Sequence, residues 1–288
     1  MQKIIIFTDS TCDLTKELLE EYDIHVVPLY IEIAGKSYKD GVDINTEQMY
    51  EMVENGVGFP KSSAPTPQDF YDAFLPYIND GFDIIYTGIS SNMSSSTNHA
   101  EIAKEMFSEA QQEHIHVVDS KELSSGIGLL LLKAATWRKQ GLDVKTIVMK
   151  MQEIVPHIRA QFCIETLEYL HKGGRCSSLT QIFGATFKIK PQIKVVDGNM
   201  GVYKKTVGTL SRAVSKMVDE FIDLFDGGDV DPEFVFITHS MSPNQALKIR
   251  DQISEQTPKI KHLYETNAGV VISTHCGPET IGILYIMK

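Results

Sequence analysis

The chain has 288 residues, enough for one large domain or two of ordinary size. It is 42% hydrophobic, and its 38 acidic and 27 basic side chains give a formal net charge of −11. This negative charge argues against general nucleic-acid binding and against adsorption on anionic membranes, because both depend on basic surfaces. Residues 1–6 lack the apolar core of a signal peptide, and the apolar run at 126–135 is too short to span a bilayer. We therefore expect a cytoplasmic protein without stable membrane insertion.

In the first half of the chain, short apolar β-rich segments alternate with segments of helical spacing. The expected strands are residues 3–8, 25–33, 83–88 and 115–118. The expected helices are residues 14–21, 46–54 and 125–140, with two more that end near residues 78 and 110. This alternation predicts parallel strands joined by crossovers, and such sheets bind ligands beyond the carboxyl ends of their strands. The pairs that fall at such ends are Asp9-Ser10, Ser90-Ser91 and Asp119-Ser120.

From about residue 155 the pattern changes to that of a mixed sheet with helices. The expected strands are residues 158–164, 191–196, 202–205, 234–238, 260–265 and 281–286, and the expected helices are residues 166–171, 210–225 and 245–256. Residues 197–199, Asp-Gly-Asn, are typical of a hairpin turn. The sequence thus predicts an α/β fold with two domains, an N-terminal parallel-sheet α/β/α domain (1–155) and a C-terminal mixed-sheet α/β domain (156–288). The segment 59–76 is the part of the first half expected to pack with the second domain.

The most informative stretch is residues 83–97, which combines a buried strand, a hydroxyl-rich loop and a helix start. A helix N-terminus has unpaired backbone N–H groups and a partial positive charge, so Ser94 and Ser95 beside it suit a phosphate or a carboxylate. No Gly-Lys pair of a nucleotide-binding loop is present, which favours holding an anion over transforming it. The alternative is that Ser94 or Ser95 only caps the helix.

His275 is the histidine that the sequence singles out, in residues 273–280, which we expect to be a turn between apolar runs. An imidazole can donate a hydrogen bond to an anion and titrates near neutral pH. It could equally satisfy the backbone of the turn. Cys276 beside it lacks an evident base, so thiol catalysis is disfavoured.

Ser94 and His275, with Asp9 or Asp119, supply the residue types of a serine hydrolase acting on a small ester. The sequence lacks G-x-S-x-G, the sharp turn that exposes such a nucleophile in many hydrolases. A hydrolase is therefore the alternative function, and a structural or regulatory module without a ligand is a third.

Metal and cofactor sites have little support in the sequence. The four cysteines are Cys12, Cys163, Cys176 and Cys276. None forms a C-x-x-C pair. His114 and His116 would share one face of a strand, but no Cys or carboxylate cluster accompanies them. We expect no cofactor and no metal.

Two small cationic spots stand out in this acidic chain. Arg175 follows a double glycine and could form a bidentate contact with a carboxylate or a phosphate. It could also pair with an acidic residue on the surface. Lys204 and Lys205 follow the expected hairpin. Such localised cations indicate either a docking face or ordinary solvated side chains.

The order and spacing of several short motifs resemble the DegV family of bacterial fatty-acid-binding proteins over essentially the whole chain. One motif is the Ser-Ser-Ala-Pro-Thr run that begins at Ser62, another is the serine-rich loop that contains Ser94, and a third is His-Cys-Gly-Pro from His275. The others are residues 9–14, 27–29, 40–43, 170–177 and 188–191. The chain departs from the family pattern at Ala64, Ser95, Lys205 and Glu279.

The resemblance implies a long-chain fatty acid buried between two α/β domains. It implies that Ser62, Ser94 and His275 bind the fatty-acid carboxylate, with Ser63 and Ser95 as further head-group contacts. It also implies a carrier without catalysis of its own, which presents the acyl chain to a separate fatty acid kinase that makes acyl phosphate. Arg175 and Lys205 are the positions expected to dock that kinase.

Overall fold

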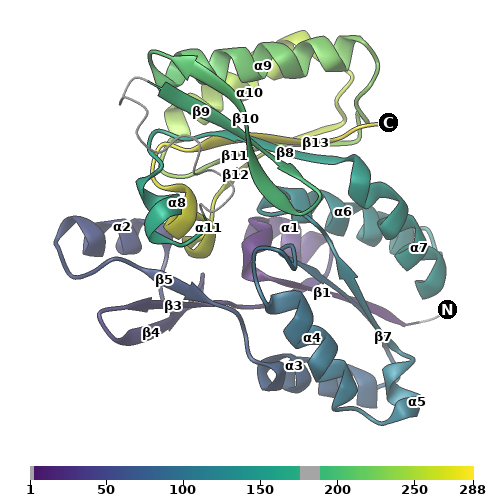
Figure 1. Ribbon diagram of the computed structural model, residues 1–288. Coiled ribbons are helices and arrows are strands. Elements are labelled where there is room, and N and C mark those ends of the chain that lie inside the picture. The colour runs from purple at the N-terminus through teal and green to yellow at the C-terminus, as the bar shows by residue number, and fades with distance from the viewer. Residues whose placement is uncertain (1–2, 176–188) are drawn as a thin grey trace.

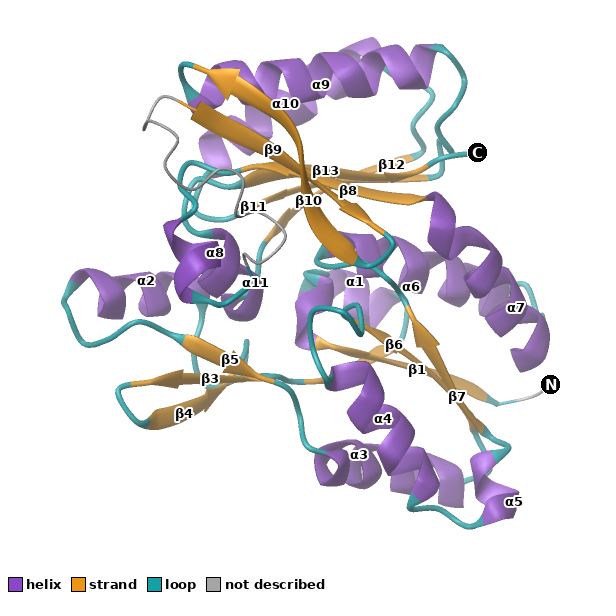
Figure 2. Ribbon diagram, in the orientation of Figure 1, coloured by secondary structure: helices purple, strands orange, loops and turns teal. Residues whose placement is uncertain are grey.

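The structure is a computed structural model that describes residues 3–175 and 189–288 (Figure 1). Three residues of the motifs above, Cys176, Ser177 and Lys188, lie outside the described residues. Two larger sheets with helices on their faces make up most of the molecule, and a small third sheet lies beside them (Figure 2). No helix in the described part of the chain is long and apolar enough to cross a membrane.

The first sheet is parallel and has four strands in the order β2-β1-β6-β7. These strands are β1 (Ile4–Asp9), β2 (Ile24–Val27), β6 (Asp83–Gly88) and β7 (Ile115–Asp119). Every residue of β1 and β6 is buried, as expected for central strands of a sheet that is covered on both faces. From β1 the chain continues to β2 on one side of the sheet, whereas β6 and β7 lie on the other side of β1. The carboxyl ends of β1 and β6 therefore lie at the topological switch point, where α/β sheets bind ligands.

Helices cover both faces of this parallel sheet, which gives the expected α/β/α arrangement (Figure 1). On one face, α3 (Pro67–Asn79) and α4 (Ser96–Glu105) pack through an aromatic cluster that includes Phe70, Phe74 and Tyr86. The helices on the other face are α1 (Lys16–Glu21), α6 (Ser125–Lys139) and α7 (Val144–Ile154). The short elements η1 (Ser10–Cys12) and α5 (Glu109–Gln112) follow β1 and precede β7.

The second sheet is mixed and has six strands in the order β10-β9-β8-β13-β11-β12. The strands are β8 (Ile158–Cys163), β9 (Ile189–Val196), β10 (Asn199–Val207), β11 (Phe234–His239), β12 (His262–Asn267) and β13 (Ile281–Ile286). β11 and β12 are parallel, and the other neighbouring pairs are antiparallel. Its outer face is covered by α9 (Leu210–Asp226) and α10 (Pro243–Gln256) (Figure 1).

Helix α6 is packed between the two larger sheets. It contacts β1 and β6 of the parallel sheet and β8, β11 and β13 of the mixed sheet. Every residue from Ser125 to Ala135 is buried, including Lys133, whose ammonium group pairs with Asp231 and Glu233. The apolar run in the sequence is thus a helix shared by both sheets, and a helix that is buried all round is apolar all round.

The small antiparallel sheet has the order β4-β3-β5. Its strands are β3 (Tyr30–Ile33), β4 (Lys36–Lys39) and β5 (Lys61–Ser63). α2 (Thr46–Glu54) and α11 (Val270–Cys276) share its apolar cluster, and α8 (Glu168–Lys172), which follows η2 (Val155–His157) and β8, packs against α11. In the segment 59–76, β5 therefore contacts α11 while α3 packs on the parallel sheet. The domain boundary at residue 155 stays a prediction.

Several local predictions were wrong, each for an identifiable reason. Residues 25–33 form two strands rather than one, because Pro28 cannot donate to a ladder. The helix expected to reach residue 110 ends at Glu105, and α5 follows separately. β4, β5 and α7 were not among the expected elements, and the two strands are too short to show a clear period. Residues 273–276, expected in a turn, are the end of α11, a helix too short to show a clear helical period.

Candidate functional site

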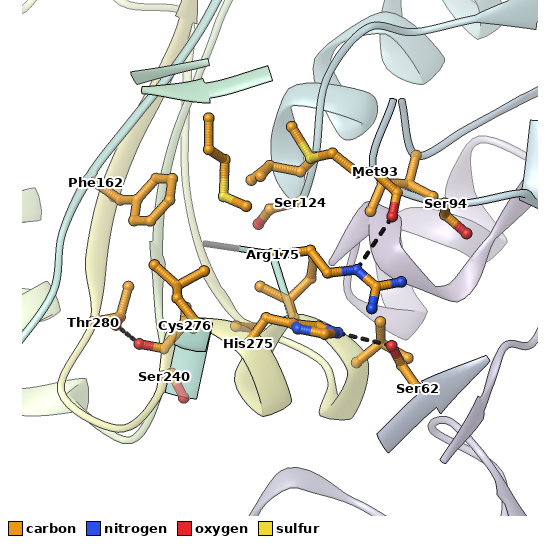
Figure 3. A pocket seen from close by; sticks show the side chains of 18 of the residues that line it. Ser62, Met93, Ser94, Ser124, Phe162, Arg175, Ser240, His275, Cys276 and Thr280 are labelled. Atoms are coloured by element: carbon orange, nitrogen blue, oxygen red, sulfur yellow. Dashed lines mark hydrogen bonds between the residues drawn. The ribbon is translucent and has the colours of Figure 1, made fainter. Parts of the chain in front are cut away.

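A cavity of about 260 Å³ lies where the inner face of the mixed sheet meets the loops of the parallel sheet and the small sheet. Its walls come from β5, the loop before α4, the segment just before α6, α8, α11 and four strands of the mixed sheet. Segments from both halves of the chain thus line one cavity. Figure 3 shows apolar side chains at one part of this cavity and a group of polar side chains at another.

Two of the predicted site residues are bonded to each other in the polar part. The Oγ atom of Ser62, on β5, lies 2.7 Å from Nε2 of His275, at the end of α11 (Figure 3). Among the described residues, Nδ1 of His275 is buried and has no hydrogen-bond partner. The ring therefore keeps one nitrogen for a further polar contact.

The imidazole of His275 is held neutral by its surroundings. Burial, and to a smaller extent the charge of Arg175, lower its pKa to about 4. The backbone of α8 comes close to the ring, since a Cβ added at Gly173 would lie 2.2 Å from Nδ1. A side chain larger than hydrogen at this position would displace the imidazole. Gly173, the first residue of the double glycine, thus leaves the space that the imidazole of His275 occupies.

Arg175 lies at the cavity and not only on the outer surface. Its Nη1 donates to the carbonyl oxygen of Gly173 at 2.9 Å, and its Nε donates to that of Met93 at 3.4 Å. In Figure 3 the guanidinium group lies between Met93 and the Ser62–His275 pair. These contacts tie the end of α8 to the serine-rich loop and place a permanent positive charge at the polar end of the cavity.

Ser94 lies on the loop between β6 and α4 and lines the cavity. Its Oγ also accepts the backbone N–H of Ser96, the first residue of α4, at 3.2 Å, so this serine does bind a backbone group at the helix start. Its role in holding an anion stays a prediction. Ser63 and Ser95 line the cavity too, and both are exposed. Ser95 is the N-cap residue of α4, but its side chain makes no capping hydrogen bond.

The buried carboxyl group of Asp9 supports this loop from below. Its oxygens accept the backbone N–H of Ile89 and the hydroxyl of Tyr86, each at 3.1 Å. Gly88 has no room for a side chain, because an added Cβ would lie 2.3 Å from both Oδ2 of Asp9 and the Tyr86 hydroxyl. Burial raises the pKa of Asp9. Asp9 is therefore a structural support and lies beneath the cavity loop.

The hydrolase triad suggested by the sequence is not formed. His275 bonds to Ser62 and not to Ser94. Asp9 bonds to the residues just described, and Asp119 pairs with Ser91 and Lys121. Burial raises the pKa of the Cys276 thiol to about 12, so it is protonated at neutral pH. Within residues 3–175 and 189–288, no group of three or more His, Cys, Asp or Glu side chains is placed to hold a metal ion.

The rest of the cavity wall is mainly apolar and was not predicted from the sequence. The side chains that face it come from elements far apart in the chain and include Met93, Phe162, Met200, Ile272 and Leu284. Any of them could have been an ordinary core residue, and no local pattern marks them as cavity walls. Lys205 lies elsewhere, exposed on the edge strand β10.

A model of the family described as "Uncharacterised protein, DegV family" matches residues 3–288. The chain belongs to the DegV family. It is 34% identical over 289 residues to a DegV domain-containing protein of Clostridium acetobutylicum, and the match covers 100% of both chains. The resemblance seen in the short motifs therefore extends over the whole sequence.

Solved structures share the fold of this DegV chain. A stearic acid-binding protein of Eubacterium ventriosum has a TM-score of 0.88 and 27% identity, with 100% of this chain and 99% of that one covered. The Fatty Acid Kinase (Fak) B3 protein of Streptococcus pneumoniae, solved with linoleic acid, has a TM-score of 0.83 and 21% identity, with 100% of both chains covered. The second likeness is evidence for the fold alone.

The low pKa of His275 predicts a pH-dependent stability. With a folded pKa of about 4 against an ordinary value of 6.5, the unfolded chain binds a proton in this interval that the folded chain does not. The free energy of unfolding should therefore fall as the pH falls from 6.5 to 4. His275→Gln, which cannot titrate, should flatten this fall in urea unfolding curves measured at several pH values. Equal slopes for the two proteins would contradict a buried, neutral His275.

Proposed function

We propose that this protein binds a long-chain fatty acid, with the acyl chain in the apolar part of the cavity and the carboxylate against Ser62, Ser94 and His275. The observation that carries the proposal is the single cavity that joins an apolar wall to a cluster of hydrogen-bond donors. Ser63 and Ser95, which line the cavity and are exposed, are the proposed further head-group contacts. The proposed function is that of a carrier that catalyses no reaction itself.

The two ends of a fatty acid have opposite requirements, and the cavity suits both. Each buried methylene contributes about 0.8 kcal/mol, so the acyl chain would supply most of the affinity. A carboxylate removed from water needs charged or hydrogen-bonding partners to offset its desolvation. The hydroxyls of Ser62 and Ser94, a neutral His275 and the guanidinium of Arg175 are such partners. The likeness to a stearic acid-binding protein supports the same ligand class.

We further propose that the carrier presents its fatty acid to a separate fatty acid kinase, which phosphorylates the carboxylate. The support is the family membership, and the chain also shares its fold with a protein named for fatty acid kinase. Arg175, at the polar end of the cavity, and Lys205, exposed on β10, are the proposed docking positions. A kinase needs access to the carboxylate, and Arg175 is the cation nearest to where that group would lie.

The direct test of the carrier function is mass spectrometry of an organic extract of the freshly purified native protein. We expect about one long-chain fatty acid per chain, because an apolar cavity of this kind retains its ligand through purification. The extract would also give the length and unsaturation of the acyl chain. An empty extract, together with no binding of added stearate or oleate, would refute the proposal.

A pair of serines on the same loop gives a matched test of the head-group site. Ser94→Ala should weaken stearate binding by about tenfold, because one hydrogen bond to a charged group is lost. Ser91→Ala is the control, since the Ser91 hydroxyl bonds to Asp119 and lies outside the cavity lining. Its affinity should stay within about twofold of the wild type. Equal affinities for the two variants would remove Ser94 from the site.

The docking role of Lys205 predicts a change in acyl phosphate formation without a change in lipid binding. Lys205→Glu reverses a charge on the exposed edge strand, so with fatty acid kinase and ATP the rate should fall about tenfold at subsaturating carrier. Stearate affinity should be unchanged. Lys248→Glu makes the same charge change on α10 and should leave the rate unaltered. If both variants behave alike, Lys205 is not part of the docking face.

A further inference from the structure

The short helix α11 carries His275 near its end, and its beginning is held by two buried carboxyl groups. α11 has seven residues, and its N-cap residue, Gly269, offers no side chain to cap it. A helix of this length is unstable alone, and the first four N–H groups of any helix lack partners within it. The position of α11 therefore depends on what binds those groups.

Asp13 and Asp40 supply the missing partners from the other half of the chain. Oδ1 of Asp13 accepts the N–H of Gly269 at 2.8 Å. Oδ1 of Asp40 accepts the N–H of Val270 at 3.0 Å, and its Oδ2 lies 3.4 Å from the N–H of Val271. Three consecutive N–H groups at the start of α11 are thus bound by two carboxyl groups more than two hundred residues away in sequence.

Both carboxyl groups are themselves fixed in place. The hydroxyl of Ser10 donates to Oδ2 of Asp40 at 2.8 Å, and the hydroxyl of Ser124, at the start of α6, donates to Oδ2 of Asp13. Both Asp side chains are buried, and Asp13 has a left-handed backbone, with φ of +51°, which favours Asp or Asn over most other residues. Neither residue lines the cavity.

Burial, with a smaller contribution from nearby carboxyl groups, raises the pKa of Asp40 to about 6 and that of Asp13 to about 8. Asp40 is therefore mainly ionised at neutral pH. Hydrogen bonds to an ionised acceptor are stronger than those to a neutral one, and a negative charge at a helix N-terminus also interacts favourably with the helix dipole. Of the two, Asp40 is expected to hold α11 more firmly.

We propose that Asp13 and Asp40 are positioning residues of the fatty-acid head-group site, which hold the first turn of α11 and thereby place His275 against Ser62. Val270 and His275 lie five positions apart, so the N–H bound by Asp40 and the residue that carries the imidazole are about 7.5 Å apart along one short helix. A shift of the first turn would carry the ring with it. This inference rests on the proposed fatty-acid function, but it concerns residues that never touch the ligand.

The test compares two ligands that differ only at the head group, stearate and octadecanol. Asp40→Ala should lower the affinity for stearate by about tenfold, the size expected for the loss of one hydrogen bond to a charged group. It should change the affinity for octadecanol by less than about twofold, because the apolar walls are intact. In the His275→Ala background the effect of Asp40→Ala on stearate should vanish, since the two residues act through one element.

Two further variants keep the test decisive. Asp40→Asn keeps one oxygen acceptor without the charge and should give a smaller loss, again confined to stearate. Asp143→Ala removes a carboxylate that caps α7, where Oδ1 of Asp143 accepts the N–H of Thr146 at 3.0 Å, and should change neither affinity. Equal losses for stearate and octadecanol, or a full effect of Asp40→Ala without His275, would overturn the inference while leaving the carrier function intact.

A measurement without ligand separates the inference from the proposed function. The imidazole nitrogen resonances of His275, assigned by their loss in His275→Ala, should shift in Asp40→Asn and not in Asp143→Ala when recorded on lipid-free protein. Unshifted resonances would refute the positioning role. If the wild type bound no stearate, the proposed carrier function would be refuted. The resonances would still decide whether Asp40 positions His275.

Discussion

The hydrogen bond between Ser62 and His275 joins residues 213 positions apart in sequence, and the polar end of the cavity depends on it. A polar pair away from solvent is stable only when its partners are held in place, because an unpaired buried group costs free energy. β5, α8 and α11 converge on this pair, and Gly173 leaves the room that the ring needs. The small sheet and the two short helices, packed on one another through apolar side chains, hold the pair in this position.

The segments around the cavity are also held in place by buried contacts. α6 is buried between the two sheets, so the apolar core is continuous from one sheet to the other, and the residues just before this helix line the cavity. Asp9 supports the serine-rich loop from the parallel sheet, and Asp13 and Asp40 hold α11. Buried carboxyl groups thus fix both sides of the polar end, although none of them lines it.

Local sequence patterns predicted most of the regular structure, because long amphipathic helices and buried apolar strands have clear periods. They failed for β4, β5 and α11, short elements whose stability comes from contacts with distant segments. The same elements carry Ser62 and His275. Residue types alone led to the prediction of an anion site at the serine-rich loop, and this stays a prediction, whereas the expectation of a turn around His275 was wrong.

The sequence by itself determined the α/β class, the order of most elements, the family and the serines and histidine expected at the head group. It could do so because these depend on residue types and spacing within short segments or within ordered motifs. Only the tertiary structure decided that His275 pairs with Ser62 rather than Ser94, that Arg175 lies at the cavity, and that Asp13 and Asp40 hold α11. The physical reason is that these contacts join segments far apart in sequence, and no local pattern records which distant partner a buried polar group will find.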